Sequence, residues 1–212
     1  MARGRLISIE GLDGAGKTTV AAGLRAALAQ RGVAALLLRE PGGVEVSERI
    51  RDLVKDPALT VGPRAEALLY AAARAQLVDE AIRPRLDDGA LVLVDRFVDS
   101  SLAYQGAGRD LGMDAVRAIN DFGTGGLRPD RTLLLRVDPA TGRARREQRL
   151  EAFDRLEAEA EAFFARIAAA YDELAAAEPD RVRVIDAAQS PDAVLRDALA
   201  ALEGVVEAPQ SG

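Results

Sequence analysis

The sequence predicts an α/β fold built on a parallel sheet, and three patterns favour it. Short apolar runs alternate with longer amphipathic stretches, as in chains that alternate strands with helices. Most of the short runs are continuously hydrophobic, which is typical of strands covered by helices on both faces. Charged residues directly follow four of these runs, at the sheet edge where ligands of such folds bind.

The expected elements follow from these runs and from helix-end signals. Pro63 and Pro191 suit the first turn of a helix, Ser190 suits a helix cap, and Gly32 and Gly204 suit helix ends. We expect one domain over residues 1–204 and a flexible tail over 205–212. The predicted strands are 6–10, 33–38, 90–95, 132–137 and 182–185. The predicted helices are about 18–30, 45–55, 63–83, 114–122, 139–149, 156–177 and 191–203.

Residues 11–18, Gly-Leu-Asp-Gly-Ala-Gly-Lys-Thr, match the phosphate-binding P-loop pattern between a predicted strand and a predicted helix. Its glycines let successive backbone N–H groups point inward, and the helix N-terminus adds partial positive charge. Lys17 should reach the β- and γ-phosphates of a nucleotide, and the Thr18 hydroxyl should bind Mg²⁺. The fold is therefore expected to be the three-layer P-loop NTPase fold with a five-stranded sheet. The predicted ATP-binding residues are Gly11, Leu12, Asp13, Gly14, Ala15, Gly16, Lys17, Thr18 and Thr19.

The amino-acid composition excludes several kinds of catalytic and binding site. The chain has neither cysteine nor histidine, which excludes disulfides, a cysteine-based zinc site, a thiol nucleophile and a histidine base. The net charge of −6 argues against non-specific nucleic-acid binding, so local arginines must meet any anionic substrate. No signal-like apolar core precedes the first strand, and no apolar run approaches a membrane span. We expect a cytoplasmic protein with no nucleic-acid or membrane partner.

Asp95 ends the apolar run 91–94, which is the Walker B arrangement of P-loop proteins. Its carboxylate is expected to support the magnesium bound at Thr18. The alternative is an ordinary aspartate that forms a turn at a strand end.

Residues 95–106, Asp-Arg-Phe-Val-Asp-Ser-Ser-Leu-Ala-Tyr-Gln-Gly, closely resemble a block of the thymidylate kinase family. Four further blocks resemble that family in matching order over nearly the whole chain. They are Glu-Gly-Leu-Asp-Gly-Ala-Gly-Lys-Thr-Thr at 10–19, Arg-Glu-Pro-Gly-Gly at 39–43, Tyr-Ala-Ala-Ala-Arg-Ala-Gln at 70–76 and Asp-Arg-Leu-Glu at 154–157. The resemblance implies direct transfer of the ATP γ-phosphoryl group to dTMP, with Mg²⁺, in a homodimer.

The resemblance also implies where dTMP binds. Arg96 would hold the acceptor phosphate, since a guanidinium fork suits phosphate oxygens, and Arg51 would be a second ligand. Glu40 would lie near the sugar and acceptor phosphate, and Asp13 would face the 3′ hydroxyl. Tyr104 would crowd the 2′ position. At the base, Tyr70 would stack on thymine, Arg74 would bind a carbonyl, and Ser101 and Gln105 would contact the pyrimidine edge. For Tyr70 the alternative is a core aromatic, and for Arg74 a solvated helix face.

Residues 138–157 resemble the lid of nucleoside monophosphate kinases, where cations stabilise charge in the transition state. Gly14 stands where some family members have an arginine, so the resemblance implies the type whose catalytic arginine comes from the lid. Arg149 is favoured, with Arg145 and Arg146 next, and the predicted catalytic residues are Lys17, Asp95, Arg96 and Arg149. The alternative is an exposed helix with ion pairs to Glu147 and Glu151. The lid arginines are Arg143, Arg145, Arg146, Arg149 and Arg155.

Two alternative functions remain at this stage. One is a related kinase with another acceptor, such as a deoxynucleoside or dUMP. The other is a GTPase-like switch, although the Asn-Lys-x-Asp sequence that usually recognises guanine is absent. The homodimer has only loose support, from a helix at 114–122 and from apolar residues that core packing explains equally well. Those residues are Leu68, Leu69, Leu77 and Ile82.

Overall fold

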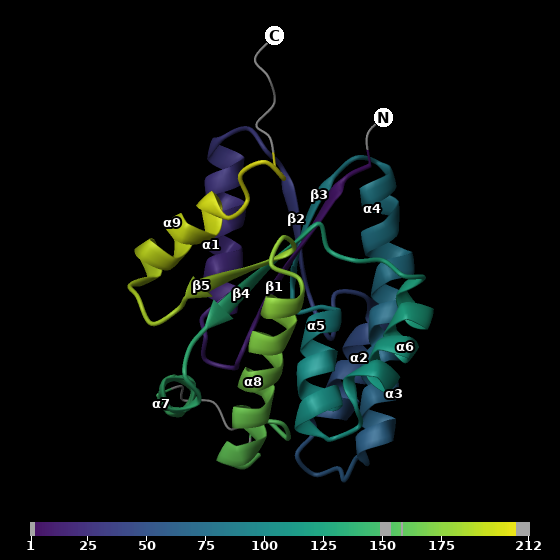
Figure 1. The fold of residues 1–212 in the computed structure, drawn as a ribbon. Coiled ribbons are helices and arrows are strands. Elements are labelled where there is room, and N and C mark those ends of the chain that lie inside the picture. The colour runs from purple at the N-terminus through teal and green to yellow at the C-terminus, as the bar shows by residue number, and fades with distance from the viewer. Residues whose placement is uncertain (1–2, 149–153, 158, 207–212) are drawn as a thin grey trace.

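Figure 1 shows the protein as a computed structural model, which describes residues 3–148, 154–157 and 159–206. Five parallel strands form one sheet in the order β2-β3-β1-β4-β5, as the sequence predicts. The strand that leads into the P-loop, β1, is the central one, with β3 and β2 on one side of it and β4 and β5 on the other. The strands are β1 (Arg5–Gly11), β2 (Ala35–Arg39), β3 (Leu91–Asp95), β4 (Arg131–Arg136) and β5 (Val182–Asp186).

Helices cover the sheet on both faces. In Figure 1, α1 and α9 lie together on one side, and α3, α4, α6 and α8 lie on the other. The described helices are α1 (Lys17–Gln30), α2 (Glu45–Lys55), α3 (Pro63–Leu77), α4 (Arg83–Asp87), α5 (Val98–Ser101), α6 (Met113–Thr124), α7 (Pro139–Glu147), α8 (Glu161–Ala177) and α9 (Pro191–Ala200). Two π-helical segments, η1 (Val78–Ile82) and η2 (Leu102–Gly108), continue α3 and α5.

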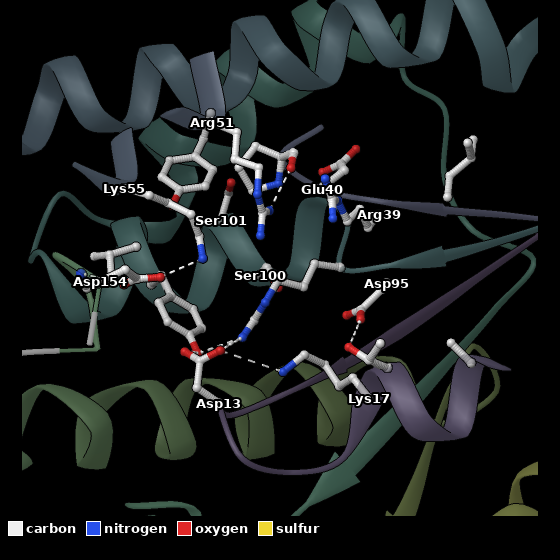
Figure 2. A pocket seen from close by; sticks show the side chains of 18 of the residues that line it. Asp13, Lys17, Arg39, Glu40, Arg51, Lys55, Asp95, Ser100, Ser101 and Asp154 are labelled. Carbon is white, nitrogen blue, oxygen red and sulfur yellow. Dashed lines mark hydrogen bonds and ion pairs between the residues drawn. The ribbon is translucent and has the colours of Figure 1, made fainter. Parts of the chain in front are cut away.

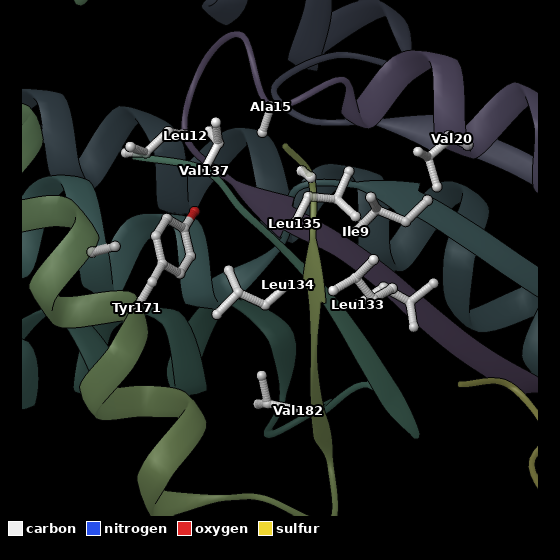
Figure 3. Close-up of a cluster of buried hydrophobic side chains, with 14 of the residues drawn as sticks. Ile9, Leu12, Ala15, Val20, Leu133, Leu134, Leu135, Val137, Tyr171 and Val182 are labelled. Carbon is white, nitrogen blue, oxygen red and sulfur yellow. The ribbon is translucent and has the colours of Figure 1, made fainter. Parts of the chain in front are cut away.

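The apolar strands bury alternate residues on opposite faces, as strand geometry requires. Leu91 and Leu93 belong to the larger core cluster, whereas Val92 and Val94 belong to a second cluster with η1 and α4. Figure 3 shows part of the larger cluster, where Ile9 of β1 and Leu135 of β4 lie among the buried side chains. Fully burying one such aliphatic side chain stabilises the fold by about 1.5–3 kcal/mol.

Strand register places the predicted site residues at one edge. Ile9 pairs with Asp95, and Asp95 pairs with Arg39 on its other side. The carboxyl ends of β1, β2 and β3 therefore lie side by side. This alignment brings the P-loop, the segment after β2 and the segment after β3 together.

The predicted elements match the observed ones with a few differences. The helix expected over 63–83 is divided into α3, η1 and α4, and the helix expected from 156 begins at Glu161. The α5–η2 segment was not predicted. Leu77 and Ile82 are fully buried core residues, so they do not belong to a surface for dimerisation. Val205 and Val206 pack against the core, whereas the rest of the expected tail lies outside the described residues.

Within the described parts of the chain, none of the helices is both long and apolar enough to cross a membrane.

Candidate active site

A cavity of about 890 Å³ opens at the carboxyl ends of β1, β2 and β3. Two groups of predicted residues line it: those expected to bind ATP and those expected to bind the phosphate acceptor. On the P-loop side it is lined by Asp13, Gly14, Gly16, Lys17, Thr18 and Thr19, with Asp95 beside them. On the acceptor side it is lined by Glu40, Arg51, Tyr70, Arg74, Arg96, Ser101, Tyr104 and Gln105. The structure thus brings all nine predicted dTMP-side residues, Asp13 included, to one cavity.

The P-loop backbone needs glycine where it turns most sharply. Gly14 has a φ of 85°, and a Cβ there would lie 2.3 Å from the carbonyl oxygen of Gly142 in α7. An arginine at this position would therefore collide with α7. The predicted lid-arginine type stays a prediction. Leu12 and Ala15 point into the core, so they can offer a nucleotide only their backbone groups.

Lys17 lies folded over the loop from which it projects. Its Nζ donates to the carbonyl oxygens of Gly11 at 3.1 Å and Leu12 at 2.9 Å, and it lies 3.9 Å from Asp13. Burial, and then the nearby charge of Arg96, lower the pKa of Lys17 to about 8. Phosphate oxygens bound in the loop would place negative charge beside this buried ammonium group and favour its charged form.

The Thr18 hydroxyl donates to the carboxylate of Asp95 at 2.9 Å (Figure 2). This contact joins the end of β3 to the first turn of α1. Hydroxyl and carboxylate oxygens are the hard ligands that Mg²⁺ prefers, so the two residues fit the predicted metal site.

Arg96 occupies a strained turn at the centre of the cavity. Its φ of 71° is rare for a residue other than glycine. The guanidinium donates to Asp13 at 2.5 Å and to the hydroxyl of Tyr104 at 3.1 Å, and it lies over the Tyr104 ring. Tyr104 itself donates to Asp13 at 2.8 Å. The turn therefore fixes the guanidinium beside the P-loop, where it could hold an acceptor phosphate next to a nucleotide.

The Asp13 carboxylate is the anion that balances these cations. Burial alone would raise the pKa of Asp13, but the charges of Arg96 and Lys17 and the bond from Tyr104 hold it well below its usual range. Asp13 is therefore ionised at neutral pH. Its predicted contact with a sugar hydroxyl stays a prediction, because both carboxylate oxygens already accept protein hydrogen bonds.

Arg74 is completely buried, and each of its three side-chain nitrogens already donates to a protein acceptor. Its partners are the carboxylate of Glu40, the hydroxyl of Ser101, the side-chain oxygen of Asn120 and the carbonyl of Phe97. The solvated helix face considered for Arg74 is therefore wrong. Its predicted bond to a base carbonyl would require it to give up one of these partners.

Glu40 is the charge partner of Arg74, with Nε 2.6 Å from Oε2. Burial raises the pKa of Glu40 to about 6, and the charge of Arg74 opposes this. The second oxygen, Oε1, is buried and accepts no hydrogen bond from the described residues. This oxygen is available to a donor on a ligand or on water in the cavity. Nearby, Arg51 donates to the carbonyl of Pro41 at 2.8 Å.

The lid arginines differ in where they lie. Arg146 is buried, donates to the backbone oxygen of Asp13 at 2.9 Å and stacks over Phe164. Arg145 lines the cavity and donates to the carbonyl of Ala187, after β5. Arg143 forms the exposed pair with Glu147 that the alternative predicts. Arg149, the favoured catalytic residue, lies outside the described residues.

Arg155 does not line the cavity. It donates to Glu66 of α3 at 2.6 Å and to the backbone of Val54 at 2.9 Å. Lys55 at the end of α2 forms an ion pair with Asp154 at 2.5 Å (Figure 2). Arg155 therefore anchors the end of the lid segment to α2 and α3.

Comparison with known proteins identifies the family. The family model described as thymidylate kinase matches residues 9–198. The chain belongs to the thymidylate kinase family. It is 51% identical over 190 residues to a thymidylate kinase of Lactobacillus delbrueckii subsp. bulgaricus, covering 88% of this chain and 90% of that one. It is 48% identical over 192 residues to one of Deinococcus radiodurans, covering 91% and 93%.

A solved thymidylate kinase structure from Ehrlichia chaffeensis matches the fold with a TM-score of 0.78 at 27% identity. The match covers 95% of this chain and 99% of that chain. The resemblance seen in the sequence motifs is therefore confirmed as membership of the thymidylate kinase family, and the α/β P-loop fold is confirmed with it.

Sequence reasoning missed two buried glutamates that support the site of this family member. Glu10 of β1 accepts from the backbone N–H of Phe97 at 2.7 Å and from Ser100 at 2.5 Å, so it braces the turn that carries Arg96. Burial, and then the charge of Asp99, raise the pKa of Glu10 to about 7. A charged residue within an otherwise apolar strand was the available signal. The other, Glu66, had no signal because its helix looks amphipathic.

Proposed function

We propose that the protein transfers the γ-phosphoryl group of ATP to dTMP, giving ADP and dTDP. The observation that carries the proposal is that one cavity is lined by the P-loop, by Arg96 and by the aromatic and polar side chains proposed to bind the base. Membership of the thymidylate kinase family supports thymidylate as the acceptor.

The P-loop side would bind the phosphates of ATP through its backbone N–H groups and Lys17. Mg²⁺, when bound at Thr18 with Asp95 behind it, would neutralise phosphate charge. An oxygen of the dTMP phosphate attacks the γ-phosphorus, and the bond to the β-bridging oxygen breaks. The attacking oxygen is already anionic, so no strong base is needed, in keeping with a chain that lacks histidine. Arg96 would align the acceptor phosphate for this attack.

At the nucleoside end, Tyr70 offers an aromatic face at the cavity wall, and Gln105 and Ser101 offer polar groups beside it. Tyr104 is buried and donates to Asp13, which supports the proposal that its ring excludes a 2′ hydroxyl. These assignments are proposals that rest on the shared cavity.

The lid would supply positive charge to the transferring group. We retain Arg149 as the proposed catalytic lid arginine, and Arg145 is the candidate from the described residues because it lines the cavity. Arg146 has a different role, since its contacts with the Asp13 carbonyl and Phe164 hold the P-loop against α7 and α8.

We also propose that the protein is a homodimer. Phe122 of α6 is 91% exposed and Leu68 of α3 is 57% exposed, and the two helices pack against each other. Exposed apolar groups on neighbouring helices mark an interaction surface, which a second copy would cover. Light scattering should give twice the chain mass, and Phe122→Glu should give a monomer. A wild-type monomer at high concentration would exclude the dimer.

The direct test is to incubate the protein with ATP, MgCl₂ and one acceptor at a time, and to separate the products by anion exchange. We expect dTDP and ADP in equal amounts from dTMP, and little product from thymidine or dGMP. Hydrolysis of ATP without any phosphorylated acceptor would instead support a nucleotide switch. Faster phosphorylation of another acceptor would assign the protein to a different kinase activity.

A further inference from the structure

Glu66 of α3 is fully buried and contacts Gln105, which lines the cavity. It accepts hydrogen bonds on both oxygens from three side chains that lie 39 to 89 residues further along the sequence. On Oε1 it accepts from Gln105 Nε2 at 3.0 Å and Arg109 Nε at 3.2 Å. On Oε2 it accepts from Arg109 Nη2 at 3.1 Å and Arg155 Nη2 at 2.6 Å.

These contacts fix the orientation of the Gln105 amide. A carboxylate that accepts from two guanidinium groups can only accept from the amide as well, so the amide nitrogen must face Glu66. The amide oxygen of Gln105 must then point elsewhere. No described residue donates a hydrogen bond to it, and Gln105 lines the cavity. The side chain therefore offers a bound base a hydrogen-bond acceptor.

Arg74, another polar side chain predicted to contact the base, already donates to protein acceptors. Its N–H groups bind Glu40, Ser101, Asn120 and the Phe97 carbonyl. Within the described residues, the amide oxygen of Gln105 is therefore more available to a bound base than the N–H groups of Arg74 are.

We propose that Glu66 is a positioning residue that sets the base preference of the enzyme by holding the Gln105 amide with its oxygen toward the cavity. A 4-oxo pyrimidine has a ring N3–H that can donate to this oxygen. A 4-amino pyrimidine has a bare N3 lone pair there, which would face the oxygen and leave both groups unpaired. The inference rests on the proposed function, in which this cavity binds the base of dTMP.

The matched pair of acceptors for a test is dTMP and 5-methyl-dCMP, which differ only at ring positions 3 and 4. For the wild type, kcat/KM should favour dTMP by at least about 100-fold. In Glu66→Gln, the two arginine Nη2 groups keep the oxygen of the new amide on the Oε2 side. Its NH₂ group then faces both Gln105 and Arg109 Nε, so Arg109 Nε loses its acceptor. The Gln105 amide can turn over to present its oxygen to the new NH₂, which places its own NH₂ toward the cavity.

The preference should therefore fall at least about tenfold in Glu66→Gln. The loss should appear mainly in KM for dTMP and far less in kcat, because the phosphate end is untouched. A purely structural role would lower activity with both acceptors equally. An unchanged preference in a folded Glu66→Gln protein overturns the proposal.

Two further variants test whether the effect passes through Gln105. Arg109→Lys disturbs the same carboxylate but spares its bond to Gln105, so the preference should stay within about twofold of wild type. In a Gln105→Ala background, Glu66→Gln should no longer change the preference. A large change in either case contradicts the proposal.

Should Glu66→Gln fail to fold, the wild type and Glu66→Asp still decide the matter by titration calorimetry with the two nucleotides. Aspartate keeps a carboxylate that can only accept, so both proteins should bind dTMP at least about tenfold more tightly than 5-methyl-dCMP. Equal binding overturns the proposal. Tight, selective binding of dTMP without formation of dTDP would refute the proposed function and leave the role of Glu66 intact.

Discussion

Replacing Glu10 by glutamine should change how the stability of the protein responds to pH. The carboxyl group is buried beneath the Arg96 turn and contacts Phe97 N–H, Ser100 and Tyr171. Burial is the main reason that its pKa rises from 4.5 to about 7, and the charge of Asp99 adds to it. Glutamine has nearly the same shape but cannot ionise.

The direction follows from the two pKa values. Because the folded pKa is higher, the unfolded chain gives up this proton first as pH rises. The contribution of Glu10 to stability is therefore complete below pH 4.5 and is lost as pH rises to about 7. One pKa unit corresponds to about 1.4 kcal/mol, so the loss approaches roughly 3 kcal/mol.

Urea unfolding of both proteins at several pH values from 5 to 8 measures this difference. The free energy of unfolding of the wild type should fall relative to that of Glu10→Gln across the range. Glu178→Gln is a control of opposite sign, since the hydrogen bond from Arg181 lowers the pKa of Glu178. There the wild type should lose its advantage only as pH falls below about 4.5. The decisive quantity is the free energy of unfolding of the wild type minus that of Glu10→Gln. If this difference stays constant or grows as pH rises, the reasoning is refuted.

Two other substitutions have equally definite outcomes. Tyr104→Phe removes the hydroxyl that ties the ring to Asp13, so it should cost about 1 kcal/mol in urea unfolding. The ring is then no longer fixed in place, so activity with the ribonucleotide analogue of dTMP should rise; unchanged sugar preference would count against the role of Tyr104. Arg146→Ala removes the bond to the Asp13 carbonyl and the stacking on Phe164, so KM for ATP should rise about tenfold in steady-state assays. Arg143→Ala, which loses only an exposed ion pair, should leave that KM unchanged.

The sheet and the P-loop could be predicted from the sequence because their signals are local. A continuous apolar run indicates a buried strand, and the glycine spacing of the loop specifies its backbone. The α5–η2 segment escaped prediction because its glycines and serines look like a loop. Its helical form depends on burial of Leu102 and Tyr104 in the core cluster, with η2 packed against α8. Such contacts join parts of the chain that the sequence does not show as neighbours.

The sequence predicted which residues line the acceptor end of the candidate site, but not which hydrogen bonds these residues form with the rest of the protein. All the residues expected at the acceptor end do line one cavity. That Arg74 is occupied by four protein partners could not be foreseen, because those partners lie up to 46 residues away. Glu66 likewise looks like an ordinary surface glutamate, and only the fold brings Gln105 and Arg155 onto its carboxylate.

The central claim is that one nucleotide held by the P-loop meets a second one held by Arg96. Formation of dTDP by Arg96→Ala, at saturating ATP and with ATP affinity measured alongside, tests it most directly. We expect dTDP formation to fall at least about 100-fold, which corresponds to about 3 kcal/mol, with a much smaller change in ATP affinity. Near-normal formation of dTDP by this variant would contradict the account.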